Sequence, residues 1–376
     1  MASDGRRVTV GFPRMRKEPG ERRDFLPSLL ARLARHGVEI VVERGIGCGM
    51  GFRDADYTAV GPAVRTGTHD EAYGQDIVVV LRCPNDDELD LVRSEATLVS
   101  MLHFPTRPAR VARLQRQGVD GIAMDCIVDD SGIRLVEDSH AVAWNGLEAA
   151  FDALEQTFTD LRDRERPPLH VTVMGAGSIG RHAVEAATKY GRIERAEDLL
   201  SKGVPGVEVV TLGRNLTGDV RYMEERLRMT DVLVDTTLRS DPSVPLVPNR
   251  WIELLPEHAV ICDCVVDPYQ LDAEPPTVRG IEGIPQGNLD RYVFSPDDPA
   301  WELTIPAGIP HAHRRTVVSC YSWPGVHPEA CMKLYGAQLA PLLEVLVDRG
   351  GAAKIRDDGH FHERALARSL VHRWVA

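Results

Sequence analysis

Short apolar runs alternate with amphipathic stretches in the N-terminal third of the chain. Consecutive β-branched and apolar residues predict buried strands, and apolar residues three and four positions apart predict helices. The strands expected on this basis are Val8–Phe12, Val38–Val42, Ile77–Leu81, Thr97–His103 and Gly121–Asp125, and the helices are Leu26–His36 and Arg107–Gln117. This alternation predicts an α/β domain with a largely parallel sheet.

The same alternation resumes after a long predicted helix, His140–Arg164, which two prolines terminate. The strands expected beyond it are Leu169–Met174, Val207–Leu212, Val232–Thr236 and Val260–Asp263, with a helix running to Tyr190 after the first of them. Residues 268–310 are rich in proline and glycine and are expected to be irregular, whereas Leu334–Leu346 and His362–Val375 are expected to be helices. A chain of 376 residues with this layout predicts two domains.

The composition narrows the classes of partner. A formal charge of −12 argues against nucleic acid and against an anionic membrane surface. The sequence has no signal-like N-terminus and no apolar run of about 18 residues, so we expect no membrane span. Seven scattered cysteines without a CxxC pair predict reduced thiols and a cytoplasmic location.

The sequence GAGSIG places Gly175, Gly177 and Gly180 between a predicted strand and a predicted helix. In that context, a G-x-G-x-x-G pattern is typical of a dinucleotide site, where the glycines allow a tight turn, the approach of a pyrophosphate and close helix packing. The helix N-terminus favours the anion. The alternative is a glycine-rich turn that binds nothing.

The end of the next strand bears on the choice of dinucleotide. An NAD site usually has Asp or Glu there to hold the ribose 2′-hydroxyl, but this chain has Gly213 followed by Arg214. A missing carboxylate beside a guanidinium favours the 2′-phosphate of NADP. NAD stays open, with Arg214 as a solvated loop residue and another acid reaching the ribose.

Several blocks in fixed order resemble the alanine dehydrogenase family, whose relatives include lysine-forming saccharopine dehydrogenases, carboxyethylornithine synthases and NAD-binding transhydrogenase subunits. They are the opening VGFPRMRKEPGERRDFLP, then LRCP, LHFP, GAGSIG, DVLVDTTL, ICDCVVD and WPGVHPEACMKLYG. The resemblance implies two Rossmann-like domains with parallel sheets and catalysis in the cleft between them. The substrate domain would comprise residues 1–140 and 315–376, with the dinucleotide-binding domain, 141–314, inserted into it.

The resemblance also implies roles for residues of the substrate domain. His103 corresponds to the family's catalytic histidine, and imidazole can exchange a proton near neutral pH. Arg22 corresponds to the arginine that binds the substrate carboxylate, and Arg134 to an arginine of the saccharopine dehydrogenases. His103 could instead be a surface or capped histidine, and Arg22 a solvated charge in a basic stretch.

Two positions depart from the family pattern. Arg82 replaces a lysine that contacts substrate and shares the acid–base work, and a guanidinium can hold a carboxylate but cannot act as a base. Ser322, expected in the substrate site, stands where alanine dehydrogenases have asparagine. Both changes weaken an assignment to alanine as substrate, and Arg82 could instead form a structural ion pair.

Further cofactor contacts are expected from the later family blocks. Asp267 matches an aspartate near the nicotinamide and is expected to be catalytic, with a helix cap or turn residue as the alternative. The full set expected to bind cofactor is Gly175, Gly177, Ser178, Ile179, Gly180, Gly213, Arg214, Thr236, Thr237, Leu238 and Val266. We expect no metal, because neither His311-x-His313 nor His360-x-His362 has a suggestive third ligand.

The sequence therefore predicts an NAD(P)-dependent amino-acid dehydrogenase that moves hydride between the nicotinamide and the α-carbon of an amino acid or its imine. One alternative is an opine-type reductase that joins a keto acid to a second amino acid. Another is a non-catalytic NADP-binding regulatory protein. The partner is expected to be a small amino acid or keto acid, and relatives suggest a homo-oligomer.

Overall fold

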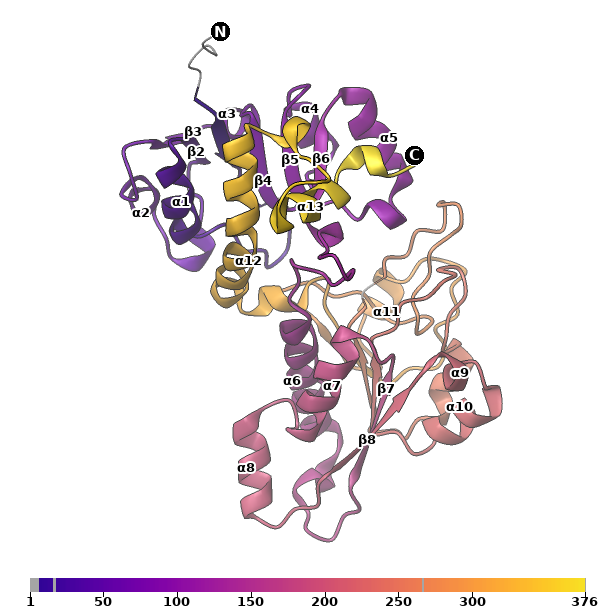
Figure 1. The fold of residues 1–376 in the computed structure, drawn as a ribbon. Coiled ribbons are helices and arrows are strands. Elements are labelled where there is room, and N and C mark those ends of the chain that lie inside the picture. Colours follow the sequence, from indigo (N-terminus) through magenta and orange to yellow (C-terminus); the bar gives the residue numbers. More distant parts are fainter. Residues whose placement is uncertain (1–6, 16–17, 266, 376) are drawn as a thin grey trace. The chain divides into compact units, whose positions relative to one another are not determined.

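The computed structural model describes residues 7–15, 18–265 and 267–375 and divides the chain into two compact units (Figure 1). Unit 1 combines residues 1–138 with 327–376, and unit 2 is the continuous segment 139–326. The sequence-based boundaries at 140 and 314 differ from this division at the second point. The difference arises because β12, Thr316–Ser319, pairs with a strand of the second sheet.

Unit 1 is built on a six-stranded sheet with strand order β3-β2-β1-β4-β5-β6. Every adjacent pair is parallel. The strands are β1 Thr9–Phe12, β2 Glu39–Glu43, β3 Val64–Gly67, β4 Ile77–Arg82, β5 Thr97–Met101 and β6 Asp120–Ala123. The direction in which strands are added reverses between β1 and β4, and ligands of doubly wound sheets bind at the carboxyl ends of strands at such a point.

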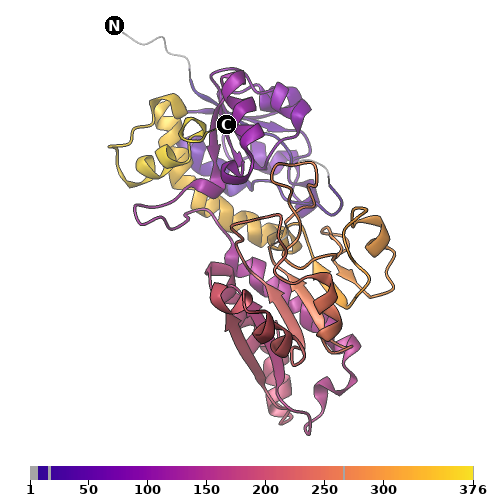
Figure 2. The same ribbon diagram turned by 90° about the vertical axis from the view of Figure 1, so that its right-hand side faces the viewer.

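The helices of unit 1 come from both ends of the chain. They are α1 Pro27–Leu33, α2 Asp54–Thr58, α3 His69–Tyr73, α4 Asp86–Asp90, α5 Pro108–Gln117, α12 Pro328–Arg349 and α13 Phe361–Arg368. Helix α12 packs against α1, and both views show the yellow C-terminal segment alongside the indigo and violet strands (Figures 1 and 2). The C-terminal segment therefore completes the core of a domain that the N-terminal segment begins.

Helix α12 is long and apolar enough to cross a membrane by length and composition, and it is the one such helix among the residues described. Its apolar side chains, including Leu339, Leu343 and Leu346, are buried in the core of unit 1. A buried core helix of a globular domain has the same composition, so this helix is weak evidence for a membrane span.

Unit 2 has a second six-stranded sheet, with strand order β11-β12-β10-β9-β7-β8. The strands are β7 Leu169–Met174, β8 Val207–Leu212, β9 Val232–Asp235, β10 Val260–Asp263, β11 Val293–Phe294 and β12 Thr316–Ser319. All neighbours are parallel except the edge pair β11–β12. Strands β8 and β9 lie on opposite sides of β7, so the switch point of this sheet falls at the carboxyl end of β7.

The helices of unit 2 are α6 Ser139–Thr157, α7 Ser178–Thr188, α8 Ile193–Ser201, α9 Arg214–Thr217, α10 Val220–Leu227 and α11 Ala300–Leu303. Helix α6 packs on α7 and against β10 and β12. Its buried face consists mainly of alanine and leucine, which allow close approach to the sheet. The α/β class with two largely parallel, Rossmann-like sheets is confirmed.

Candidate functional site

The glycine-rich turn follows the buried strand β7 and leads into α7. Gly175 has φ +101°, a conformation that side-chain-bearing residues rarely adopt. A Cβ at Gly180 would lie 2.2 Å from the Gly175 carbonyl oxygen, so this position packs helix against turn. A Cβ at Gly177 would meet nothing within 4 Å. The turn is thus closed at Gly180 and open at Gly177, where the backbone amides of the helix N-terminus begin.

This geometry fits a pyrophosphate. Gly177 is the N-cap of an 11-residue helix, so the first amides of α7 face outward from an open backbone. The predicted contact Ser178 has its Oγ 2.7 Å from the Oγ of Ser139 on α6, and Ile179 is half-buried. The residues present therefore fit a dinucleotide.

The neighbouring strand, β8, is not followed by an acidic residue. Leu212, the last residue of β8, is buried, whereas Gly213 and Arg214 are exposed. Arg214 is the first residue of α9, and a Cβ at Gly213 would meet nothing within 4 Å. The place of the usual ribose-binding carboxylate is open, and a guanidinium stands next to it.

The segment after β9 lies against the glycine turn. The hydroxyl of Thr236 donates to the carbonyl oxygens of Met174, at 2.8 Å, and Gly175, at 3.2 Å. Leu238, two residues later, is 88% exposed. Of the predicted cofactor contacts, Val266 falls outside the described residues. Thr237 donates hydrogen bonds to Asp235, which belongs to a cluster of charged residues of which sequence reasoning predicted only Asp267.

Three aspartates and two arginines gather at the carboxyl ends of β9 and β10. Asp235 and Asp263 end these strands in the same register and are buried. Asp263 pairs with Arg279, and Asp267 pairs with Arg239 at 2.6 Å. The carboxylate proposed to act near the nicotinamide is thus already in an ion pair. Neither arginine belongs to a pattern that could have revealed it, because both lie in irregular segments.

Asp235 is fully enclosed, and its pKa is raised to about 7 by burial and by the charges of Asp263 and Asp267. Hydrogen bonds from the amide and hydroxyl of Thr237, at 3.0 and 2.7 Å, offset part of this increase. The Asp235 carboxyl therefore holds a proton at mildly acidic pH that the unfolded chain has released.

We expect Asp235→Asn to change the pH dependence of stability. Because the folded-state pKa lies above the ordinary value of 3.8, the wild-type protein should lose stability as pH rises from about 4 to about 7. The variant should lack this component and be more stable than wild type at pH 8. Thermal unfolding of both proteins from pH 4 to pH 8 checks this, and parallel pH profiles would contradict it.

In unit 1, His103 follows β5 in a left-handed conformation, with φ 51°. Its Nδ1 lies 3.3 Å from Oδ2 of Asp125, and its backbone N–H donates to Oδ1 of the same carboxylate at 3.1 Å. The imidazole side chain is 54% exposed, whereas Asp125 is buried. Sequence reasoning missed the pairing of Asp125 with His103.

The pairing with His103 changes the pKa of Asp125. Burial raises the pKa of its carboxyl, but the hydrogen bond and charge of His103 outweigh burial and lower it to about 2. Arg134 reaches the same place, since its Nε donates to the Asp125 carbonyl oxygen at 2.9 Å. The structure therefore brings two predicted residues, His103 and Arg134, into contact with one aspartate.

The arginines expected to hold the substrate carboxylate have different surroundings. Arg22 is exposed, whereas its neighbour Arg23 is 3% exposed and pairs with Glu21 at 2.7 Å. Arg82, at the end of β4, pairs with Glu18 and lies 3.7 Å from Glu21. The ion-pair alternative for Arg82 is thus present in the structure, and the buried guanidinium of the GERRD run is Arg23.

Ser322 lies in unit 2, where its carbonyl oxygen accepts the N–H of Gly325 at 2.9 Å. The expected place in the substrate domain is therefore corrected, because the segment after β12 stays with the second sheet. Among the described residues, no group of three or more His, Cys, Asp or Glu side chains could hold a metal.

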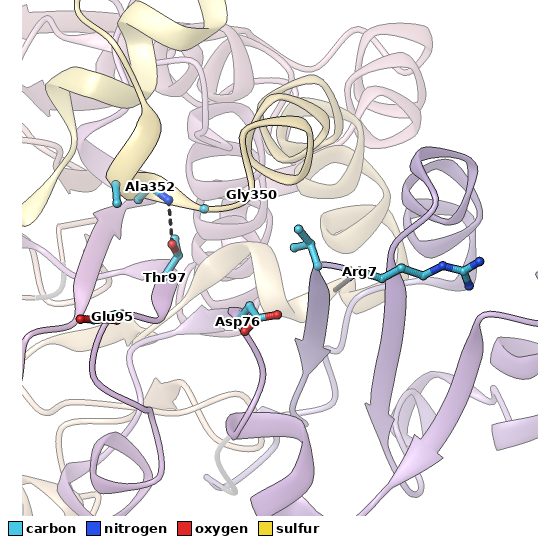
Figure 3. A pocket seen from close by; sticks show the side chains of 9 residues that line it. Arg7, Asp76, Glu95, Thr97, Gly350 and Ala352 are labelled. Carbon is cyan, nitrogen blue, oxygen red and sulfur yellow. Dashed lines mark hydrogen bonds between the residues drawn. The ribbon is translucent and has the colours of Figure 1, made fainter. Parts of the chain in front are cut away.

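A pocket of unit 1 lies at the amino ends of the strands of its sheet, whereas His103 follows the carboxyl end of β5 (Figure 3). It is lined by Asp76 before β4, Thr97 at the start of β5, and Gly350 and Ala352 after α12. The hydroxyl of Thr97 accepts the N–H of Ala352 at 2.8 Å. Since these residues flank the amino ends of the strands, the pocket is separate from His103, which follows the carboxyl end of β5.

Comparisons with known proteins agree with this arrangement. Residues 11–140 match the family model described as "Alanine dehydrogenase/PNT, N-terminal domain". The chain is 24% identical over 285 residues to the NAD(P) transhydrogenase subunit alpha of Haemophilus influenzae, a match covering 68% of the chain and 55% of that subunit. It is 25% identical over 274 residues to the alanine dehydrogenase of Mycobacterium tuberculosis H37Rv, covering 69% of the chain and 73% of that enzyme.

Two solved structures show the same fold. An L-alanine dehydrogenase superposes with a TM-score of 0.66 at 19% identity, covering 98% of this chain and 97% of that one. A transhydrogenase from Sinorhizobium meliloti gives a TM-score of 0.59 at 20% identity, covering 90% and 94%. The chain is therefore similar to the alanine dehydrogenases and to the NAD(P) transhydrogenase alpha subunits, and its residues 11–140 match the alanine dehydrogenase/PNT N-terminal domain.

Proposed function

We propose that the protein is an NAD(P)-dependent oxidoreductase that acts on the α-carbon of an amino acid or of the corresponding imine. The observation that carries the proposal is the turn between β7 and α7, which is open at Gly177 and tightly packed at Gly180. A turn that served packing alone would not need an open backbone at the start of a helix. Relatives named alanine dehydrogenase support the class of reaction.

The nicotinamide, when bound, supplies or accepts the hydride. The residues of unit 1 would hold the substrate and move a proton. With Nδ1 of His103 turned to Asp125, Nε2 is left to exchange a proton with the substrate amine or with water. Arg22, which is exposed, would hold the substrate carboxylate. Arg23 is buried on Glu21 and serves the fold.

We expect NADP(H) to bind more tightly than NAD(H), because β8 ends at Gly213 rather than at an acid and Arg214 is exposed beside it. Arg214→Ala should weaken NADP(H) binding by about 1–3 kcal/mol, the loss typical of a hydrogen bond to a charged group. NAD(H) affinity should hardly change. Titration of wild type and variant with both nucleotides checks this, and equal or better NAD(H) affinity in the wild type would contradict it.

An opine-type reductase is a second candidate, favoured by the position of Arg134. Its guanidinium is bonded to the backbone of Asp125, the partner of His103, so a second carboxylate could be held close to the proton-transfer group. The candidates differ in whether the amine donor is ammonia or an amino acid.

We therefore expect the preferred substrate to be larger or more acidic than alanine. Initial rates should be measured for alanine against glutamate-like amino acids. Pyruvate plus ammonia should be compared with pyruvate or 2-oxoglutarate plus lysine or ornithine. The expected result is a kcat/KM at least about tenfold higher for a substrate with a second charged group, the discrimination available from roughly 1.4 kcal/mol. The highest value for simple alanine–pyruvate interconversion would contradict this expectation.

The same screen tests the proposal as a whole. Turnover of any amino acid, or of any keto acid with an amine, supports an oxidoreductase acting on CH–NH bonds. Tight nucleotide binding without turnover of any pair would instead favour a regulatory nucleotide-binding protein. Failure of both nucleotides to bind would remove the proposal.

A further inference from the structure

The carboxyl ends of β9 and β10 carry a cluster of charged side chains, most of which are buried. We call it the aspartate cluster: Asp235, Asp263 and Asp267 with Arg239 and Arg279. Three carboxyl groups are set against two guanidinium groups. Buried charges are costly unless they are paired, so each arginine has a large effect on the charge that the cluster presents.

Arg239 connects the two loops that follow β9 and β10. Its Nη1 donates to the carbonyl oxygens of Pro242 and Val244, at 3.1 and 2.9 Å. Its Nη2 donates to Oδ2 of Asp267, at 2.6 Å, and to the carbonyl oxygen of Val278. The side chain is 4% exposed, whereas that of Asp267 is 32% exposed. Arg239 thus holds in place a carboxylate that solvent can reach.

Arg279 neutralises the second strand end. Its Nη1 donates to Oδ2 of Asp263 and, at 2.9 Å, to the hydroxyl of Ser319 on β12. Its guanidinium lies over the ring of Tyr269, with the central carbon 5.5 Å from the ring centroid. The charge of Asp263 is therefore neutralised within the core by Arg279, and Asp267 is the more accessible carboxylate of the cluster.

The cluster adjoins the turn proposed to bind the dinucleotide. Asp235 is followed directly by Thr236, whose hydroxyl donates to the carbonyl oxygen of Gly175. In doubly wound sheets a dinucleotide spans the switch point, one half over each side. With the 2′-phosphate end assigned to β8, the nicotinamide half would lie toward β9 and β10. This step, and the inference that follows, rest on the proposed function.

The oxidised nicotinamide ring carries a positive charge and the reduced ring is neutral, so nearby charge affects the two forms unequally. We propose that Arg239, by neutralising Asp267, sets the relative affinity of unit 2 for oxidised and reduced nucleotide. Arg239 acts through Asp267 and is therefore a positioning residue. Without it, the carboxylate would favour the cationic oxidised ring.

The test measures dissociation constants for NADP⁺ and NADPH with the full chain, by calorimetry, in wild type and in three variants. Arg239→Gln should shift the affinity ratio toward NADP⁺ by about fivefold. This is the effect expected of one uncompensated charge on a charged ring nearby when solvent screens the interaction. Asp267→Asn should shift it toward NADPH by a similar factor. The double variant should return close to the wild-type ratio.

Two control variants distinguish an effect of the lost charge from a disruption of the fold. Arg221→Gln removes an exposed guanidinium of the same unit, paired with Glu225 on the surface of α10, and should leave the ratio unchanged. Arg239→Lys keeps the charge and should keep most of the ratio. Should Arg239→Gln fail to fold by circular dichroism, Asp267→Asn still decides the matter, since that side chain is partly exposed.

Nucleotide binding with an unaltered ratio in Arg239→Gln and Asp267→Asn would overturn this inference and leave the proposed function standing. Shifts of the same sign in both variants would overturn it too, because opposite charges must act in opposite directions. Absence of binding in the wild type would instead remove the proposed function on which the inference rests.

Discussion

His103→Asn should lower kcat by roughly 100-fold or more, which is the usual contribution of general acid–base catalysis. His103 has φ 51°, and asparagine is among the residues that tolerate this conformation, so the variant removes the imidazole while keeping the backbone. Strained backbone of this kind often occurs at functional sites. The measurement is steady-state turnover with the best substrate of the screen.

The control is His36→Asn, which removes an exposed imidazole of unit 1 paired with Asp348. It should keep full turnover. Nucleotide affinity should be unchanged in both variants, because His103 and His36 belong to unit 1 and the glycine turn belongs to unit 2. Full turnover in His103→Asn would make this histidine a structural residue held by Asp125.

Arg23→Met should lower the free energy of unfolding of unit 1 by about 3–5 kcal/mol, the usual cost of removing one partner of a buried ion pair. The side chains of Arg23 and Glu21 are 3% and 2% exposed, so solvent cannot replace the lost partner. Burial alone would raise the pKa of Glu21, and Arg23 is the main group that reverses this effect. Urea denaturation followed by circular dichroism measures the loss.

The adjacent Arg22 offers a matched comparison. Arg22→Met alters an exposed side chain and should change stability by about 0.5 kcal/mol or less, while raising KM if Arg22 holds the substrate carboxylate. Combining Arg23→Met with Glu21→Gln also removes the buried carboxylate and should recover part of the lost stability. Equal stability of the Arg22 and Arg23 variants would contradict the distinction between them.

Much of the fold was predictable because the central strands are continuous apolar runs. β7, β8 and β10 have the expected bounds, and α1 with its 3₁₀ extension ends before Gly37, as predicted. Short elements were missed: β3, Val64–Gly67, contains Arg and Thr, and α8, Ile193–Ser201, lies between the helix expected to end at Tyr190 and the strand expected to begin at Val207. The long helix expected to reach Arg164 ends at Thr157 and is followed by a 3₁₀ turn. Edge strands and short surface helices bury too little apolar surface to leave a clear periodic pattern.

The site was predictable where a chemical pattern is local in sequence. The glycine turn is such a pattern, whereas the pairs His103–Asp125 and Arg239–Asp267 join residues 22 and 28 positions apart. Nothing in the sequence indicates which arginine of the GERRD run turns inward, since that depends on the position of Glu21 in the folded loop. Tertiary pairing of charges is therefore what sequence reasoning left out.

The most direct test of the central claim is NADPH binding to Gly177→Val. A Cβ at this position would meet nothing within 4 Å, so the variant should fold with an unchanged melting temperature. The added methyl groups would occupy the place of the pyrophosphate, and affinity for NADPH should fall by at least about 100-fold, the scale of losing the phosphate contacts at a helix N-terminus. Gly206→Val, at another open glycine of unit 2, should bind normally. Unchanged NADPH affinity in a folded Gly177→Val protein would contradict the account.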